Sequence, residues 1–127
     1  MSTEDKATDM RGTQCKHVND EVMLYADFGP YLQYTTSTIS SVQVSCDDDA
    51  ALTFGTATVV SVDTTVPWLN EQGQVVQGII SANKGAKVLV SEGTAQASDA
   101  QPVRVLWSVT LNTGEVINRS GRLRVES

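Results

Sequence analysis

The clearest pattern of apolar and polar positions runs along Val103–Leu111. Every second position there is apolar, in the order Val103, Val105, Trp107, Val109 and Leu111. Because successive side chains of a β-strand point to opposite faces, this alternation predicts a strand with one buried face and places Trp107 in the core. Leu106 is the exception, since it is apolar on the otherwise polar face.

The residues that follow predict a partner for this strand. Residues 112–115 form a turn sequence in which Gly114 is free to adopt a positive φ. After the turn, Arg122 and Arg124 alternate with Leu123 and Val125, which indicates a returning strand over residues 115–125. The C-terminal part of the chain is therefore predicted to be a β-hairpin.

Further strand-like runs, rich in β-branched residues, precede the hairpin. They cover residues 22–25, 35–46, 56–62, 74–81 and 86–90. With the hairpin, this makes about seven strands at a spacing of roughly ten residues, separated by turn residues. No stretch shows the 3.6-residue period of an amphipathic helix. The pattern is typical of an all-β, immunoglobulin-like antiparallel β-sandwich.

Residues 1–20 have a different composition. Ser, Thr, Asp, Lys and Gln dominate, and few large apolar side chains are present. Such a segment cannot by itself offset the entropy lost when it becomes ordered. We therefore expect a polar N-terminal arm over residues 1–20, either disordered or extended on a partner, and a β-sandwich domain over residues 21–127.

Charge narrows the expected partners. The chain has 127 residues, of which 19% are charged, and its net charge is −6. An acidic surface repels phosphate backbones and anionic headgroups, so neither nucleic acid nor membrane is an expected partner. No apolar run reaches transmembrane length, and residues 1–11 lack the apolar stretch of a signal peptide. We expect the protein to be made in a cytoplasm and to leave the cytoplasm only inside a larger particle.

Residues suited to catalysis are sparse. The single histidine, His17, lies in the polar arm, whereas a general base has to be held firmly beside its target. The acidic residues 47–49 lack the spacing of a calcium loop, so a charged turn is expected there. No glycine motif for phosphate binding occurs. We expect no enzyme activity, no catalytic residue, no cofactor and no metal.

Two cysteines, Cys15 and Cys46, leave two interpretations open. They form either a disulfide that fixes the arm to the domain or two free thiols, and a reducing cytoplasm favours free thiols. Cys15 and His17 flank Lys16 in an arrangement that resembles half of a zinc site. Zinc requires three or four ligands, so a metal site is not expected.

Four aromatic residues are candidates for contacts with a partner. Phe28, Tyr31 and Tyr34 surround a Gly-Pro turn, and Trp68 follows Pro67 in a predicted loop. Large aromatic side chains in loops anchor many protein interfaces. The alternative is that they cover the ends of the sandwich.

A resemblance to a known family rests on four segments in the C-terminal half. They are Ser-Glu-Gly-Thr-Ala at 91–95, Val-Arg-Val-Leu-Trp-Ser-Val-Thr at 103–110, Asn-Thr-Gly at 112–114 and Arg-Ser-Gly-Arg-Leu-Arg-Val at 119–125. This order of strand, alternating strand, hairpin and basic-aliphatic strand resembles the small tailed-phage virion proteins called phage fiber–tail adaptors. The resemblance extends over residues 25–125. The family usually has glycine where Glu92 stands.

The resemblance implies a structural component of a tailed bacteriophage virion, an adaptor at the neck, tail or fiber attachment. It would act through contacts with other virion proteins and form a homo-oligomer within a symmetric assembly. One alternative is a capsid decoration protein. Another, from a different class, is a carbohydrate-binding module with Trp68, Tyr31 and Tyr34 as a stacking platform.

Overall fold

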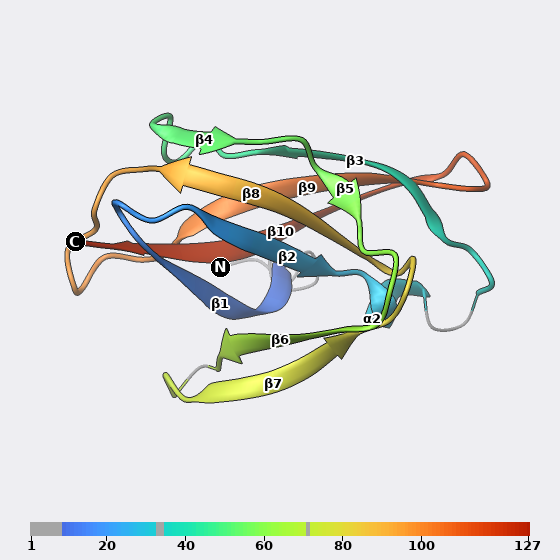
Figure 1. Ribbon diagram of the computed structural model, residues 1–127, viewed down its shortest axis with the longest axis horizontal. Coiled ribbons are helices and arrows are strands. Elements are labelled where there is room, and N and C mark those ends of the chain that lie inside the picture. Colours follow the sequence, from blue (N-terminus) through green and yellow to red (C-terminus); the bar gives the residue numbers. More distant parts are fainter. Residues whose placement is uncertain (1–8, 33–34, 71) are drawn as a thin grey trace.

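The computed structural model describes residues 9–32, 35–70 and 72–127, whose strands form two sheets (Figure 1). One sheet has the strand order β3 (Ile39–Ser45), β9 (Val103–Leu111), β10 (Val116–Glu126), β1 (Asp9–His17), β6 (Thr64–Leu69) and β7 (Val75–Ile80). The other has β2 (Val22–Asp27), β8 (Gly85–Glu92) and β4 (Leu52–Phe54), and β5 (Thr58–Val59) also pairs with β8. The all-β prediction is confirmed.

The main core lies between these two sheets. Leu24 and Val88 come from the smaller sheet, and Val105, Trp107 and Leu123 come from the larger one. Trp107 is 1% exposed, which confirms the position predicted from the alternation in β9. A second, smaller cluster of Val60, Val66 and Ile80 fills the space beside the hairpin of β6 and β7.

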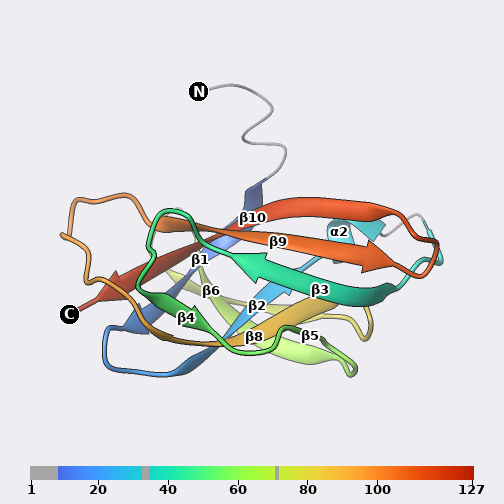
Figure 2. The same ribbon diagram turned by 90° about the horizontal axis from the view of Figure 1, so that it is seen from above.

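The C-terminal hairpin has the predicted form. Strands β9 and β10 are antiparallel and pair from Val116–Thr110 to Leu123–Val103 without interruption. The N–H of Leu111 donates to the carbonyl of Glu115 (2.8 Å), and Gly114 has a φ of 92°. Figure 2 shows β3, β9 and β10 side by side, so their outer faces form one continuous surface.

Residues 9–17 correct the predicted arm. They form β1, which lies between β10 and β6. From Thr13 to His17, β1 runs parallel to Arg122–Glu126 of β10, so one pair of strands departs from the predicted antiparallel arrangement. Backbone pairing on a neighbouring strand orders a segment with few apolar side chains. Only residues 1–8 of the predicted arm lie outside the described residues.

Strand β6 was predicted as a loop because it contains Pro67. The N–H of Asn70 donates to the carbonyl of Gln74 (2.9 Å) at the end of the β6–β7 ladder. Hydrogen-bonded pairs recur at every second position of an antiparallel ladder, so the pair of Pro67 with Gln77 belongs to the class that exchanges no hydrogen bonds. The missing N–H of Pro67 therefore costs the ladder with β7 nothing, and on the side of β1 the recorded pair is that of Leu69 with Thr13.

The predicted Gly-Pro turn is one turn of helix, α2 (Gly29–Leu32). Proline is compatible with the first turn of a helix, since N–H groups there have no partner within the helix. A carboxylate oxygen of Asp27 accepts from the N–H of Gly29 (2.8 Å) and caps this turn. Burial raises the pKa of Asp27, and the bond from Gly29 offsets part of the rise. No helix in the described part of the chain is long and apolar enough to cross a membrane.

Candidate functional site

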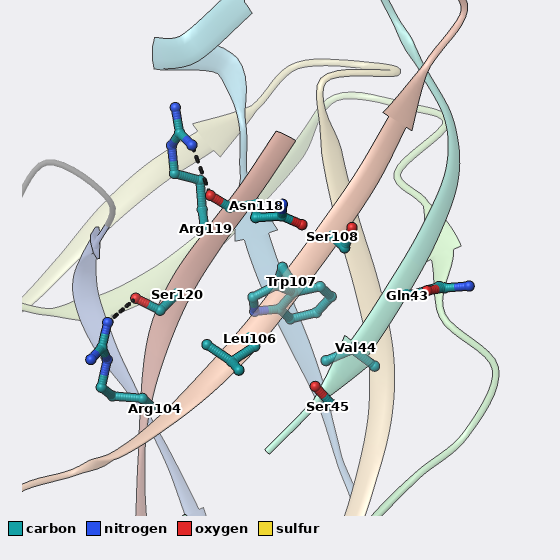
Figure 3. A pocket seen from close by; sticks show the side chains of 10 residues that line it. All are labelled: Gln43, Val44, Ser45, Arg104, Leu106, Trp107, Ser108, Asn118, Arg119 and Ser120. Atoms are coloured by element: carbon teal, nitrogen blue, oxygen red, sulfur yellow. Dashed lines mark hydrogen bonds between the residues drawn. The ribbon is translucent and has the colours of Figure 1, made fainter. Parts of the chain in front are cut away.

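A groove with a volume of about 470 Å³ lies on the surface formed by β3, β9 and β10 (Figure 3). Its lining includes a set of polar side chains and one exposed aliphatic side chain. They are Gln43 and Ser45 of β3, Arg104, Leu106 and Ser108 of β9, and Asn118 and Ser120 of β10. We call this surface the β3–β9–β10 groove.

The register of the three strands places Leu106 at the centre of this groove. Leu106 pairs with Ser45 of β3 on one side and with Ser120 of β10 on the other. Since paired residues of adjacent strands lie on the same face of a sheet, the three side chains form one row across the groove. Leu106 is 41% exposed, although its neighbours in β9, Val105 and Trp107, are buried. The one apolar residue on the otherwise polar face of this strand therefore lies at the centre of the groove.

Arg104 forms one end of the groove, and hydrogen bonds to Ser120 and Asp48 help to hold it there. Its guanidinium donates to the hydroxyl of Ser120 (3.1 Å), and its backbone N–H donates to the carboxylate of Asp48 (3.0 Å). Arg122 lies directly opposite Arg104 in the β9–β10 register, and both residues are exposed. Two arginines therefore lie opposite each other on this face, beside the carboxylate of Asp48.

The aromatic residues near α2 serve mainly to pack the fold. Phe28 is 0% exposed and belongs to the main core, so its side chain presents no surface to a partner. Tyr31 is half-buried and lies edge-to-face against Phe28, with ring centroids 6.2 Å apart. The guanidinium carbon of Arg119 lies 4.4 Å from the centroid of the Tyr31 ring. This cation–π contact joins α2 to β10. Tyr34 lies outside the described residues.

Trp68 is half-buried and packs against the smaller core cluster. Glycines of the two neighbouring strands make room for its side chain. A Cβ atom added at Gly12 of β1 would lie 2.8 Å from the Cβ of Trp68, and one added at Gly78 of β7 would lie 2.9 Å from its Nε1. Real side chains do not tolerate such distances to rigid neighbours. Tyr31 of α2, by contrast, packs against the main core cluster. The end of β6, near which Trp68 lies, points away from α2 (Figure 1).

A second cleft, of about 270 Å³, lies among β1, β2, β6 and β7. Gln14, Tyr25, Met23, Trp68 and Val75 are among its lining residues. The side-chain amide of Gln14 donates to the carbonyl of Tyr25 (2.7 Å), and its oxygen accepts from the N–H of Tyr25 (3.0 Å). The amide thus occupies the edge of β2 as a further strand would, and it links the two sheets.

Replacing Gln14 with alanine should lower the free energy of unfolding by about 1–2 kcal/mol, because two partly buried hydrogen bonds are lost. The amide proton of Tyr25 should also exchange faster with solvent. Chemical denaturation and hydrogen exchange measure the two effects. Gln43→Ala, on an exposed position of β3, is the matched control and should change stability by less than about 0.5 kcal/mol. Equal losses for both variants would contradict the bridging role of Gln14.

Cys15 and Cys46 are both free thiols, which is the interpretation that a reducing cytoplasm favours. Burial raises the pKa of the Cys15 thiol, and the carboxylate of Glu126 raises it further. Burial also raises the pKa of the Cys46 thiol. Since the thiolate is the reactive form, both residues stay protonated and weakly nucleophilic near neutral pH. Among the described residues, no three His, Cys, Asp or Glu side chains are grouped so that they hold a metal ion.

Two of the acidic residues 47–49 are hydrogen-bonded within the fold, which the prediction of a charged turn did not include. Asp49 is buried, and its carboxylate accepts from the N–H (2.7 Å) and the hydroxyl (3.2 Å) of Thr94. Asp48 accepts from the N–H of Arg104, as described above. Asp49 thus connects the turn before β4 to the segment between β8 and β9, and Asp48 connects it to β9 itself. They thereby support the end of the groove at which Arg104 lies.

Comparison of the chain with models of protein families, with curated proteins and with solved structures found no match.

Proposed function

We propose that this chain is a structural adaptor of a tailed-phage virion, which binds a neighbouring virion protein through the β3–β9–β10 groove. The observation that carries the proposal is the exposed Leu106 within a polar rim. Protein interfaces commonly combine an apolar centre with a polar, solvent-accessible rim. Side chains of three paired strands form the groove, so the surface is preorganised and loses little entropy on binding.

The lining of the groove indicates the kind of partner surface that fits. Leu106 is surrounded by polar side chains, among them Gln43, Ser108 and Asn118. An interface of this kind combines an apolar contact at its centre with hydrogen bonds around it. We infer that the partner presents an apolar side chain to Leu106 and hydrogen-bonding groups to the polar side chains around it.

The backbone at Glu92 supports the resemblance on which the virion role rests. Glu92 has a φ of 60°, and the following Gly93 has a φ of 105°. A positive φ favours glycine, which is the residue that the phage adaptor family usually has at the position of Glu92. We include in the proposal that the two sheets form an immunoglobulin-like sandwich, which fits the antiparallel β9–β10 hairpin and the core between the sheets.

The virion role is tested on particles of the phage that encodes this chain. Quantitative mass spectrometry of purified particles should find the chain at roughly a dozen copies or fewer, as expected for a symmetric neck, tail or fiber complex. Hundreds of copies would instead support the alternative of capsid decoration. Absence of the chain from particles would overturn the proposal.

Replacing Leu106 with arginine tests the groove itself. We expect incorporation into particles to fall about tenfold or more, because a third cation replaces the apolar contact at the centre of the interface. Val116→Arg is the matched control, since Val116 is 57% exposed on β10 and does not line the groove. It should leave incorporation unchanged. If Leu106→Arg is incorporated normally, the groove is not the binding surface.

A further inference from the structure

The outer edge of the larger sheet, at β7, has the features of a surface for strand pairing. Among the described residues, β7 is the last strand of this sheet and pairs only with β6. Exposed apolar edge strands pair readily with other chains, and proteins commonly protect them with charges, prolines or bulges. Strand β7, Val-Val-Gln-Gly-Ile-Ile, has no charged residue and no proline, and its register with β6 is regular.

Another edge of the fold is protected in a way that β7 is not. At β2, the amide of Gln14 occupies both the N–H and the carbonyl of Tyr25. At β7, the two side chains Val75 and Ile79 are 64% and 66% exposed, and both belong to the edge strand itself. An apolar pair this exposed on an edge indicates a surface that is covered in an assembly.

The β6–β7 ladder determines which backbone groups face outward. The Asn70–Gln74 hydrogen bond fixes the alternation, so even-numbered residues of β7 bond to β6. The N–H and carbonyl groups of Val75, Gln77 and Ile79 therefore point to the free edge. The side chains of these three residues share one face of the sheet, because strand side chains alternate.

We propose that β7 pairs antiparallel with β7 of a second copy of this chain, about a two-fold axis through Gln77. In this register, Val75 lies opposite the second copy's Ile79, and Gln77 lies opposite its own counterpart. All three outward-facing residues then pair with the same three residues of the other copy. Two β-branched cross-strand pairs flank the central glutamine pair, an arrangement that stabilises antiparallel sheets.

A second copy is the occupant that the sequence of β7 fits best. An isologous interface requires a surface complementary to itself, and the outward-facing order apolar, glutamine, apolar reads the same in both directions. The distribution of charge also permits pairing with a second copy. The chain carries a net charge of −6, but residues 72–81 contain no charged residue, so two copies approach here without direct like-charge contacts.

Cross-linking tests the register. In a Cys15→Ser/Cys46→Ser background, Gln77→Cys places two thiols opposite each other, with Cα atoms about 5.5 Å apart in a hydrogen-bonded pair. A disulfide spans this distance. Mild oxidation should give a covalent dimer. Val75→Cys is the matched control, because it lies on the same face of the same strand but opposite the second copy's Ile79, so it should not cross-link.

Sedimentation tests the association in solution. The unmodified chain should shift from the mass of one chain toward twice that mass as its concentration rises. Val75→Lys/Ile79→Lys places lysine opposite lysine and should weaken the dimer by about tenfold or more. Thr65→Lys adds a charge on the same face beside Ile79, but on β6, and should leave the dimer intact. Circular dichroism confirms that each variant is folded.

The outcomes separate this proposal from the adaptor role. Three results would overturn β7 self-pairing. The chain stays monomeric at all concentrations, or Val75→Cys cross-links as fast as Gln77→Cys, or a monomer binds a strand of another protein through β7. Leu106→Arg lies in the β3–β9–β10 groove and should leave the dimer unchanged. A result that overturns partner binding at the groove can therefore be distinguished from one that overturns β7 pairing.

Discussion

Truncating Trp107 to alanine is expected to lower the free energy of unfolding by about 3–5 kcal/mol. The side chain is 1% exposed and lies in the core between the two sheets. In the register of the larger sheet it lies between Val44 of β3 and Arg119 of β10. The residues that share this core cluster with it are themselves buried, so the truncation opens a cavity that they fill only in part.

Urea denaturation followed by circular dichroism measures this effect. Domains of this size have stabilities of roughly 5–15 kcal/mol, so the variant should remain folded in water but unfold at a much lower urea concentration. Leu106→Ala, at the preceding position of β9, is the matched control. Its side chain is 41% exposed, and the expected loss is about 1 kcal/mol or less. Similar losses for both variants would contradict the core position of Trp107.

The parts of the fold that were predictable have their signal in local sequence. Strands β9 and β10 carry a regular alternation and a glycine turn, and the structure pairs them as expected. The runs at 74–81 and 86–90 correspond to β7 and β8. In β8, β9 and β10, side chains that lie close in sequence define the buried face, so the pattern needs no knowledge of distant partners. Strand β7 was indicated by its β-branched residues, although only Ile80 of this strand is buried.

The parts that were not predictable depend on distant partners. Strand β1 is polar, and it is ordered by parallel pairing with β10, about a hundred residues further along the chain. Strand β6 contains Pro67, whose missing N–H is harmless only because of its position in the ladder with β7. Neither condition is visible in a local pattern.

The candidate site shows the same division. Leu106 stood out in the sequence as an apolar residue on a polar face, and it lies in the groove. Gln43 and Asn118 join it there only through the pairing of three strands. Phe28 and Trp68 had the character of interface aromatics, but glycine neighbours and core packing accommodate them within the fold. Burial of a loop aromatic depends on tertiary contacts that sequence spacing does not encode.

Lys16 is expected to be the polar residue whose replacement costs most. It is 2% exposed, and its ammonium group donates to the carbonyls of Glu92 (2.6 Å), His17 (2.8 Å) and Val18 (3.1 Å). An ammonium group has three protons to donate, and these three carbonyls use all of them. The contacts tie the end of β1 to the end of β8, where Glu92 has a positive φ. Lys16 thereby orders a strand that has few apolar side chains.

Replacing Lys16 with methionine keeps most of the aliphatic stem but leaves three carbonyls without their donor. We expect the free energy of unfolding to fall by about 4–5 kcal/mol, since three bonds to a charged donor are lost and each contributes about 1.5 kcal/mol or more. Lys84→Met is the matched control, because the half-buried Lys84 donates to one carbonyl, that of Ser37 (2.6 Å). It should cost about 1.5 kcal/mol, because one such bond is lost. Hydrogen exchange should locate the additional loss for Lys16→Met in β1. Equal costs for the two variants, or unchanged exchange in β1, would mean that backbone pairing with β10 alone holds this strand in the sheet.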